Sequence, residues 1–160
     1  MICMNPENTV LVPGQTVEAA DPRQVSAESK LPPNPVIYAC SGCSDVGELA
    51  DLVARELTRS GVAEMSCLAG IGGRVKSLMN KAHRAETILV IDGCPLNCAR
   101  NTLELAGFQK FHHLELHRLG FRKGACPPTP ERVGVATEAA AKMIERAPAS
   151  PTPVPAPAWT

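Results

Sequence analysis

Thr87 to Ile91 spell TILVI, a nearly continuous apolar run that is rich in β-branched side chains. Such a run is typical of a strand that is buried on both faces, as the central strands of parallel sheets are. The next residues, DGCPLNC from Asp92 to Cys98, contain Pro95, which suits a first helical turn because its missing N–H costs nothing there. The segment therefore predicts a buried strand that leads through a cysteine-containing loop into a helix.

The sequence on either side repeats this alternation of strand and helix. Short apolar runs predict further strands, and apolar residues at helical spacing predict helices, two of which end at Gly61 and Gly107. The expected strands are residues 35–39, 62–66, 87–91 and 110–116, and the expected helices are 46–57, 75–82, 96–106 and 135–144. We therefore expect an α/β fold with a mostly parallel sheet of about four strands and helices on both faces.

Composition divides the chain into three parts. Residues 1–34 are polar and have no hydrophobic period, which predicts a disordered N-terminal arm. Residues 35–147 carry the alternating pattern and are expected to form one α/β domain. Residues 148–160 are rich in proline, which predicts a flexible tail. Trp159 lies in that tail, and an inert chain end is a simpler interpretation of it than a docking motif.

Charge and aromatic content argue against two classes of partner. Lys and Arg total 16, as do Asp and Glu, so the chain has no excess of positive charge with which to replace the counterions of a nucleic acid. Aromatic residues make up 3% of the chain, too few for base-stacking platforms. The apolar runs are too short for a bilayer, and MICMNPENTV does not resemble a secretory signal. We therefore expect a cytoplasmic protein that binds neither nucleic acid nor membrane.

Seven cysteines carry the clearest functional signal. In a reducing compartment, clustered cysteines more often bind metal or carry out redox chemistry than form structural disulfides. Five of them follow expected strands, namely Cys40, Cys43, Cys67, Cys94 and Cys98. Parallel strands end at one edge of a sheet, where ligand sites form, so we expect these five to gather there. Cys3, in the arm, and Cys126, in a Pro-rich loop, are interpreted as uninvolved.

Thiolate chemistry supports a metal site at this edge. Each loop leads into a helix N-terminus, which favours the thiolate, the metal-binding form of cysteine. Four thiolates complete a tetrahedral zinc site, so one of the five is in excess, and Cys43 is the least secure ligand. Two alternatives remain open. A thiol redox or sulfur-transfer protein is favoured by the C-x-x-C spacing of Cys40 and Cys43, and cysteine-only ligation also suits an iron–sulfur cluster.

Other residues near these loops have competing interpretations. The Gly-rich turn at residues 67–73 lacks a full phosphate-binding signature, and we interpret it as a close passage of the backbone past the site. Asp92 is expected either to serve the surroundings of a ligand or to cap a turn or helix. Asp45 and Glu48 are interpreted as residues favoured by a helix dipole rather than as an acid/base pair.

The histidines give no support to a catalytic site. His112 and His113 are expected to point to opposite faces of a strand, and we interpret them, with His117, as surface or satisfied core residues. The chain has neither Gly-x-Ser-x-Gly nor His-Glu-x-x-His, so a hydrolase is not favoured and no reaction is assigned.

Three ordered motifs resemble a known family. They are YACSGCSDVG from Tyr38, SCLAGIG from Ser66 and DGCPLNCA from Asp92. Across residues 36–146 they resemble the DGC-domain family, which is named for its central Asp-Gly-Cys and is regarded as zinc-binding because of its cysteines. The resemblance implies four chelating residues, Cys40, Cys67, Cys94 and Cys98. After the fourth strand, where the resemblance leads us to expect Asp-Leu-Gly, this chain has Arg118-Leu119-Gly120.

Overall fold

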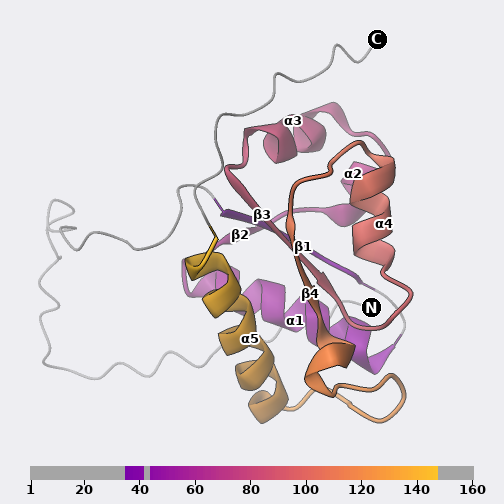
Figure 1. Cartoon of the computed structure of the whole chain (residues 1–160), viewed down its shortest axis with the longest axis vertical. Coiled ribbons are helices and arrows are strands. Elements are labelled where there is room, and N and C mark those ends of the chain that lie inside the picture. Colours follow the sequence, from indigo (N-terminus) through magenta and orange to yellow (C-terminus); the bar gives the residue numbers. More distant parts are fainter. Residues whose placement is uncertain (1–34, 42–43, 148–160) are drawn as a thin grey trace, which may run out of the picture.

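The fold is known from a computed structural model that describes residues 35–41 and 44–147. Four strands form one sheet, and helices lie on either side of it (Figure 1). The strands are β1 (Pro35–Ala39), β2 (Glu64–Met65), β3 (Thr87–Asp92) and β4 (His112–Glu115). The expected arm and Pro-rich tail, together with Cys3, Cys43 and Trp159, lie outside the described residues.

The sheet is parallel throughout, in the order β2-β1-β3-β4. Every residue of β3 is buried, as the TILVI run predicts, and β3 pairs with β1 on one side and β4 on the other. The outer strands are shorter than expected. β2 has two residues, and β4 gives way at Leu116 to a 3-10 helix, η1 (Leu116–Leu119). The predicted α/β class with a parallel sheet is confirmed.

Two apolar cores lie on opposite faces of the sheet. Alternate residues of β1 and β3, such as Ile37 and Leu89, face a core that they share with α1 (Asp45–Arg59) and α5 (Pro130–Glu145). The intervening residues, such as Tyr38 and Val90, face the second core. That core also contains residues of α2 (Leu68–Gly72), α3 (Lys76–Arg84) and α4 (Cys98–Leu105). Helices therefore cover both faces, as predicted.

Local signals explain where most helices begin and end. Ser44 caps α1 by accepting a hydrogen bond from the Gly47 amide at 3.2 Å. Gly61 and Gly107 follow helix ends with φ of 72° and 94°, the left-handed region in which glycine carries no penalty. Within the described segments no helix has the length and apolarity that a membrane crossing requires.

Three helices differ from the expectation. α4 begins at Cys98, so Pro95 lies in the turn before the helix rather than in its first turn. The Gly-rich turn contains the short helix α2, because Cys67 occupies its N-cap and accepts from the Gly70 amide. α5 begins earlier than predicted, because Thr129 caps it and Pro130 fits its first position. Its buried residues include Ala136 and Ala140, whereas Val135, the first residue of the expected helix, is 59% exposed.

Candidate functional site

The strand order creates a switch point at the carboxyl ends of the two central strands. From β1 the chain passes to β2 on one side, and it then returns to β3 on the other side of β1. Ligand sites in open α/β sheets form outside the strand ends at such a reversal. Cys40 directly follows β1 and Cys94 lies two residues beyond β3, whereas Cys67 follows the edge strand β2. Cys40 and Cys94 therefore come from the two strands that flank the switch point.

Gly93 connects these two strand ends. Its amide donates to the sulfur of Cys40 at 3.1 Å, and the Cys40 amide donates to the carbonyl of Ile91 at 2.8 Å. The Gly93 backbone also presses against the start of α1, where a Cβ at this position would lie 2.3 Å from the carbonyl oxygen of Val46. The Asp-Gly-Cys loop thus requires glycine because it passes between Cys40 and α1.

The environment of Cys40 is apolar and negatively charged. Burial is the main reason that its pKa rises from 9.0 to about 11, although the Gly93 amide acts in the opposite direction. Charges on Asp92, Cys94 and Cys98 raise it further. A cation among them would have the opposite effect and would favour the thiolates.

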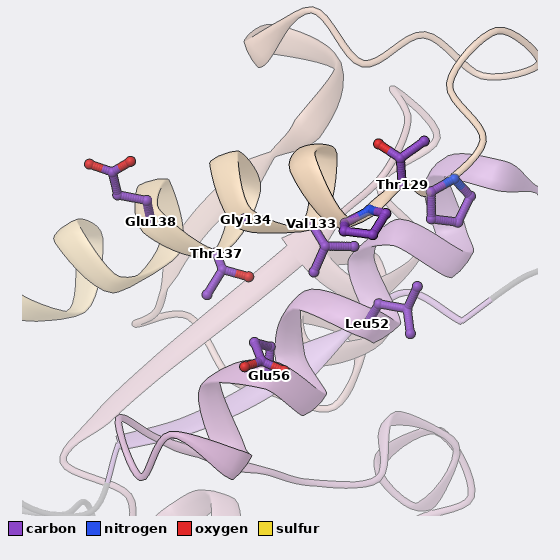
Figure 2. Close-up of a pocket in the computed structure, with 9 residues that line it drawn as sticks. Leu52, Glu56, Thr129, Val133, Gly134, Thr137 and Glu138 are labelled. Carbon is purple, nitrogen blue, oxygen red and sulfur yellow. The ribbon is translucent and has the colours of Figure 1, made fainter.

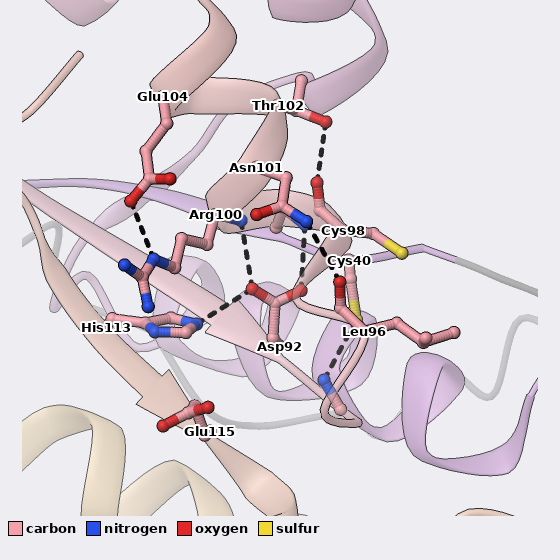
Figure 3. Close-up of polar contacts among 12 residues, drawn as sticks. Cys40, Asp92, Leu96, Cys98, Arg100, Asn101, Thr102, Glu104, His113 and Glu115 are labelled. Atoms are coloured by element: carbon pink, nitrogen blue, oxygen red, sulfur yellow. Dashed lines mark hydrogen bonds and ion pairs between the residues drawn. The ribbon is translucent and has the colours of Figure 1, made fainter.

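Asp92 caps α4 from the end of β3. Its side chain is 1% exposed, and its two carboxylate oxygens accept from the amides of Ala99 at 2.9 Å and Arg100 at 3.0 Å (Figure 3). Asn97, the residue at the N-cap position, has a left-handed backbone with φ of 51° and makes no capping bond with its side chain. The helix-capping interpretation of Asp92 therefore describes its contacts in the structure.

His113 is a partner of this carboxylate. Its Nε2 lies 2.9 Å from Asp92 Oδ2, and its side chain is 14% exposed (Figure 3). An ionised carboxylate can only accept, so the network assigns the hydrogen to Nε2. The sequence interpretation of His113 as a satisfied residue is consistent with this contact. The sequence does not reveal its link to the Asp-Gly-Cys motif, because that link depends on the pairing of β3 with β4.

The remaining expected ligands are more accessible. Cys94 is partly buried, whereas Cys67 and Cys98 are exposed. Cys98 is the first residue of α4, and the Cys67 sulfur accepts from the Gly70 amide at 3.4 Å. Across residues 35–41 and 44–147, no three His, Cys, Asp or Glu side chains are grouped so that they could hold a metal ion. The four-cysteine ligand set stays a prediction, and Cys43 lies outside the described residues.

One contact at the start of α1 was missed by the sequence analysis. The Asp45 carboxylate accepts from the amides of Gly124 at 2.9 Å and Cys126 at 2.8 Å, and these bonds lower its pKa. Cys126 packs partly against the same core as Cys40 and Cys94. Asp45 therefore holds the loop before α5 in addition to lying in a favourable helix dipole, and no local signal indicates a contact across this sequence separation.

A hollow between α1 and α5 is separate from the cysteines. It has a volume of about 700 Å³, and Figure 2 shows its lining side chains on the two helices and on the segment that leads into α5. The lining residues are Leu52, Glu56, Pro128, Thr129, Pro130, Val133, Gly134, Thr137 and Glu138. Because no cysteine lines it, this hollow is not part of the candidate site.

Comparison with known proteins supports the resemblance seen in the motifs. The family model of the DGC domain matches residues 36–147. The anaerobic and virulence modulator AnvM of Pseudomonas aeruginosa is 45% identical over 91 residues, which make up 57% of this chain and 70% of AnvM. No solved structure matches the chain.

Proposed function

This chain belongs to the DGC-domain family, and from that membership we propose that its cysteines bind a metal ion, with zinc as the ion. The proposed ligands are Cys40, Cys67, Cys94 and Cys98, with Cys43 as a further candidate. The observation that supports the proposal most directly is the placement of the described cysteines, since Cys40 and Cys94 follow the two strands that flank the switch point and Cys98 begins α4 after the same loop as Cys94.

The chemistry of the donors fits a cation. Cys40 keeps its proton at neutral pH because burial and negatively charged neighbours oppose its ionisation. Zinc is bound by thiolates, and a bound ion would supply the positive charge that lets several of them lie together. Hydrogen bonds from Gly93 to Cys40 and from Gly70 to Cys67 would steady two of the sulfurs.

Exposure of two proposed ligands supports an exchangeable site. Four thiolates would fill the coordination sphere of zinc, so a competing ligand could take the ion only by replacing a sulfur that solvent can reach. Cys67 and Cys98 are exposed, while Cys40 and Cys94 are partly buried. We therefore favour a protein that carries or senses the ion over one that uses it only to hold its fold. The relative AnvM is named as a modulator, and a modulatory role for this chain belongs to the same proposal.

A thiol redox or sulfur-transfer function is the second candidate. It is favoured by Cys98, an exposed thiol at the first position of α4 that a reagent from solvent can reach. The raised pKa of Cys40 argues against that residue as the attacking thiol. Binding of an iron–sulfur cluster is the third candidate function, because cysteine-only ligation also suits iron.

The experiment is metal analysis and an absorption spectrum of the full chain purified without oxygen. We expect about one zinc per chain and no visible bands, as befits a d¹⁰ ion held by thiolates. Cys94→Ser should lose this zinc, and Cys126→Ser, a cysteine outside the proposed set, should keep it. Iron with visible absorption would replace the proposal with a cluster, and metal-free protein with fast-reacting thiols would favour the redox alternative. Stoichiometric zinc in Cys94→Ser would show that the ligand set is wrong.

A further inference from the structure

We infer that His113 is a positioning residue of the cysteine site, because it holds the Asp92 carboxylate where that carboxylate caps α4 and so fixes Cys98. The inference deepens the proposed function, on which its zinc measurement rests. It concerns a histidine on β4 that lies outside the cysteine motifs and outside the proposed ligand set.

The first step is that Asp92 replaces a missing N-cap. The first N–H groups of a helix have no partner within the helix, and an N-cap side chain normally accepts from the second or third residue. In α4 these are Ala99 and Arg100, and Asp92 accepts from both. Because the Asn97 side chain makes no capping bond, the start of α4 depends on a carboxylate that belongs to β3.

The second step is that His113 anchors this carboxylate. Asp92 is 1% exposed, and a buried carboxylate is costly unless it is hydrogen-bonded or paired. The Arg100 side chain does not fill that role, because its guanidinium pairs with Glu104 at 2.7 Å (Figure 3). His113, reaching across from the neighbouring strand, bonds the same Oδ2 that accepts from the Arg100 amide. It thereby links β4 to the first turn of α4.

The third step connects this turn to the sulfurs. Cys98 is the first residue of α4, and the loop before it is closed by hydrogen bonds at the same turn. The Asn97 amide donates to the Cys94 carbonyl at 3.2 Å, and the Asn101 side chain donates to the Leu96 carbonyl at 3.1 Å. A looser first turn would therefore change how Cys98 lies relative to Cys94. Loss of such outer-shell support typically costs about 10- to 100-fold in metal affinity.

Three variants of the full chain separate this role from a general effect on β4. His113→Leu removes the donor and keeps an apolar side chain, whereas His113→Gln offers an N–H group at a similar distance from the backbone. His112→Leu is the matched control, because this neighbour belongs to the same strand and points to the other side of the sheet. Should His113→Leu fail to fold, His113→Asn takes its place, since its shorter amide reaches less far than that of glutamine.

Two measurements are made on each variant. Amide hydrogen exchange of metal-free protein, followed by NMR, reports on the Ala99 and Arg100 N–H groups directly. The Gly70 amide, which bonds to sulfur at the start of another helix, is the internal reference. Competition with a chelator then gives the zinc affinity.

For His113→Leu we expect amide exchange at Ala99 and Arg100 to be about tenfold faster, which is the equivalent of losing one charge-assisted hydrogen bond. We also expect zinc affinity to fall about 10- to 100-fold. Gly70 should be unchanged, and His113→Gln and His112→Leu should match the unmodified chain.

The outcomes separate this inference from the proposed function. Unchanged exchange at Ala99 and Arg100 in His113→Leu overturns the positioning role, whatever happens to zinc. Faster exchange with unchanged zinc affinity overturns the link to the metal site. If the unmodified chain binds no zinc, the proposed function fails. In that case the amide exchange rates are the only test of whether His113 fixes the start of α4. Faster exchange that is confined to Ala99 and Arg100 in His113→Leu would support the positioning role.

Discussion

The amide of Gly93 and the sulfur of Cys40 are joined by a hydrogen bond of 3.1 Å, which links the loop after β3 to the end of β1. The same glycine lies against α1, and a Cβ at position 93 would come within 2.3 Å of the Val46 carbonyl oxygen. This contact involves backbone rather than a flexible side chain. The loop therefore cannot yield without moving either α1 or Cys40.

We expect Gly93→Ala to destabilise the protein, because the added methyl group must displace backbone. Overpacking of this kind typically costs about 1–3 kcal/mol. The free energy of unfolding, obtained from urea titrations of the variant and the unmodified chain, measures the effect. If the proposed site is correct, the variant should also bind zinc more weakly. A Gly93→Ala protein with the original urea midpoint would contradict the close approach.

Gly134 provides the opposite case on α5. It is exposed in the interior of that helix, and a Cβ there would meet nothing within 4 Å. Replacing such a glycine with alanine reduces the conformational entropy of the unfolded chain and improves helix propensity. We therefore expect Gly134→Ala to stabilise the protein by about 0.5–1 kcal/mol. The readout is the urea midpoint, which should rise with an unchanged slope. A lower midpoint would mean that the hollow between α1 and α5 does not accept the methyl group.

The sequence predicted those parts of the fold that local patterns determine. The TILVI run identified the central strand, the helical spacing identified α1, and Gly61 marked the end of that helix. The positions of Cys40, Cys67 and Cys94 shortly after their strands also follow from these elements. Such features depend on residues a few positions apart, so one sequence contains the information.

The strand order and the contacts around the site depend on distant residues. Asp92 and His113 meet only because β4 pairs with β3 in one particular register. Asp45 bonds the amide of Gly124 across the space between α1 and the loop before α5. Neither pair has a spacing or composition that distinguishes it from other charged and polar residues. The candidate ligands and the capping role of Asp92 could therefore be named from sequence, whereas the partners His113 and Gly124 could not.

Asp45 should make the folding stability depend on pH in the acidic range. Hydrogen bonds from the Gly124 and Cys126 amides lower its pKa in the folded protein below the usual value of 3.8. A carboxyl group with a lowered folded pKa contributes stability above its unfolded pKa and loses that contribution as pH falls through the folded pKa. We expect the unmodified chain to lose thermal stability more steeply below about pH 4 than Asp45→Asn does.

Melting temperatures measured between about pH 2 and pH 6 test this expectation. Glu48→Gln, a change in the same first turn of α1, is the matched control and should follow the unmodified chain. At neutral pH, Asp45→Asn should melt lower, because asparagine is a weaker acceptor for the two amides. Parallel melting curves for Asp45→Asn and the unmodified chain across the acid range would show that the contact contributes nothing.

The last expectation concerns the reactivity of Cys40 in protein freed of metal. Burial and the charges of Asp92, Cys94 and Cys98 raise the pKa of this thiol to about 11, so only a small fraction is ionised near neutral pH. The thiolate is the reactive form. At pH values below the pKa, the thiolate fraction grows about tenfold for each unit by which the pH rises. We therefore expect the rate of iodoacetamide labelling at Cys40 to rise about tenfold per pH unit between about pH 8 and pH 10, without a plateau.

Peptide mass spectrometry gives the labelling rate of Cys40 separately from those of the other cysteines. Zinc added before the reagent should slow the labelling, because a metal-bound sulfur is no longer free to attack. A rate that levels off below about pH 9 would mean that Cys40 is an activated thiol, and it would favour the redox alternative over metal binding.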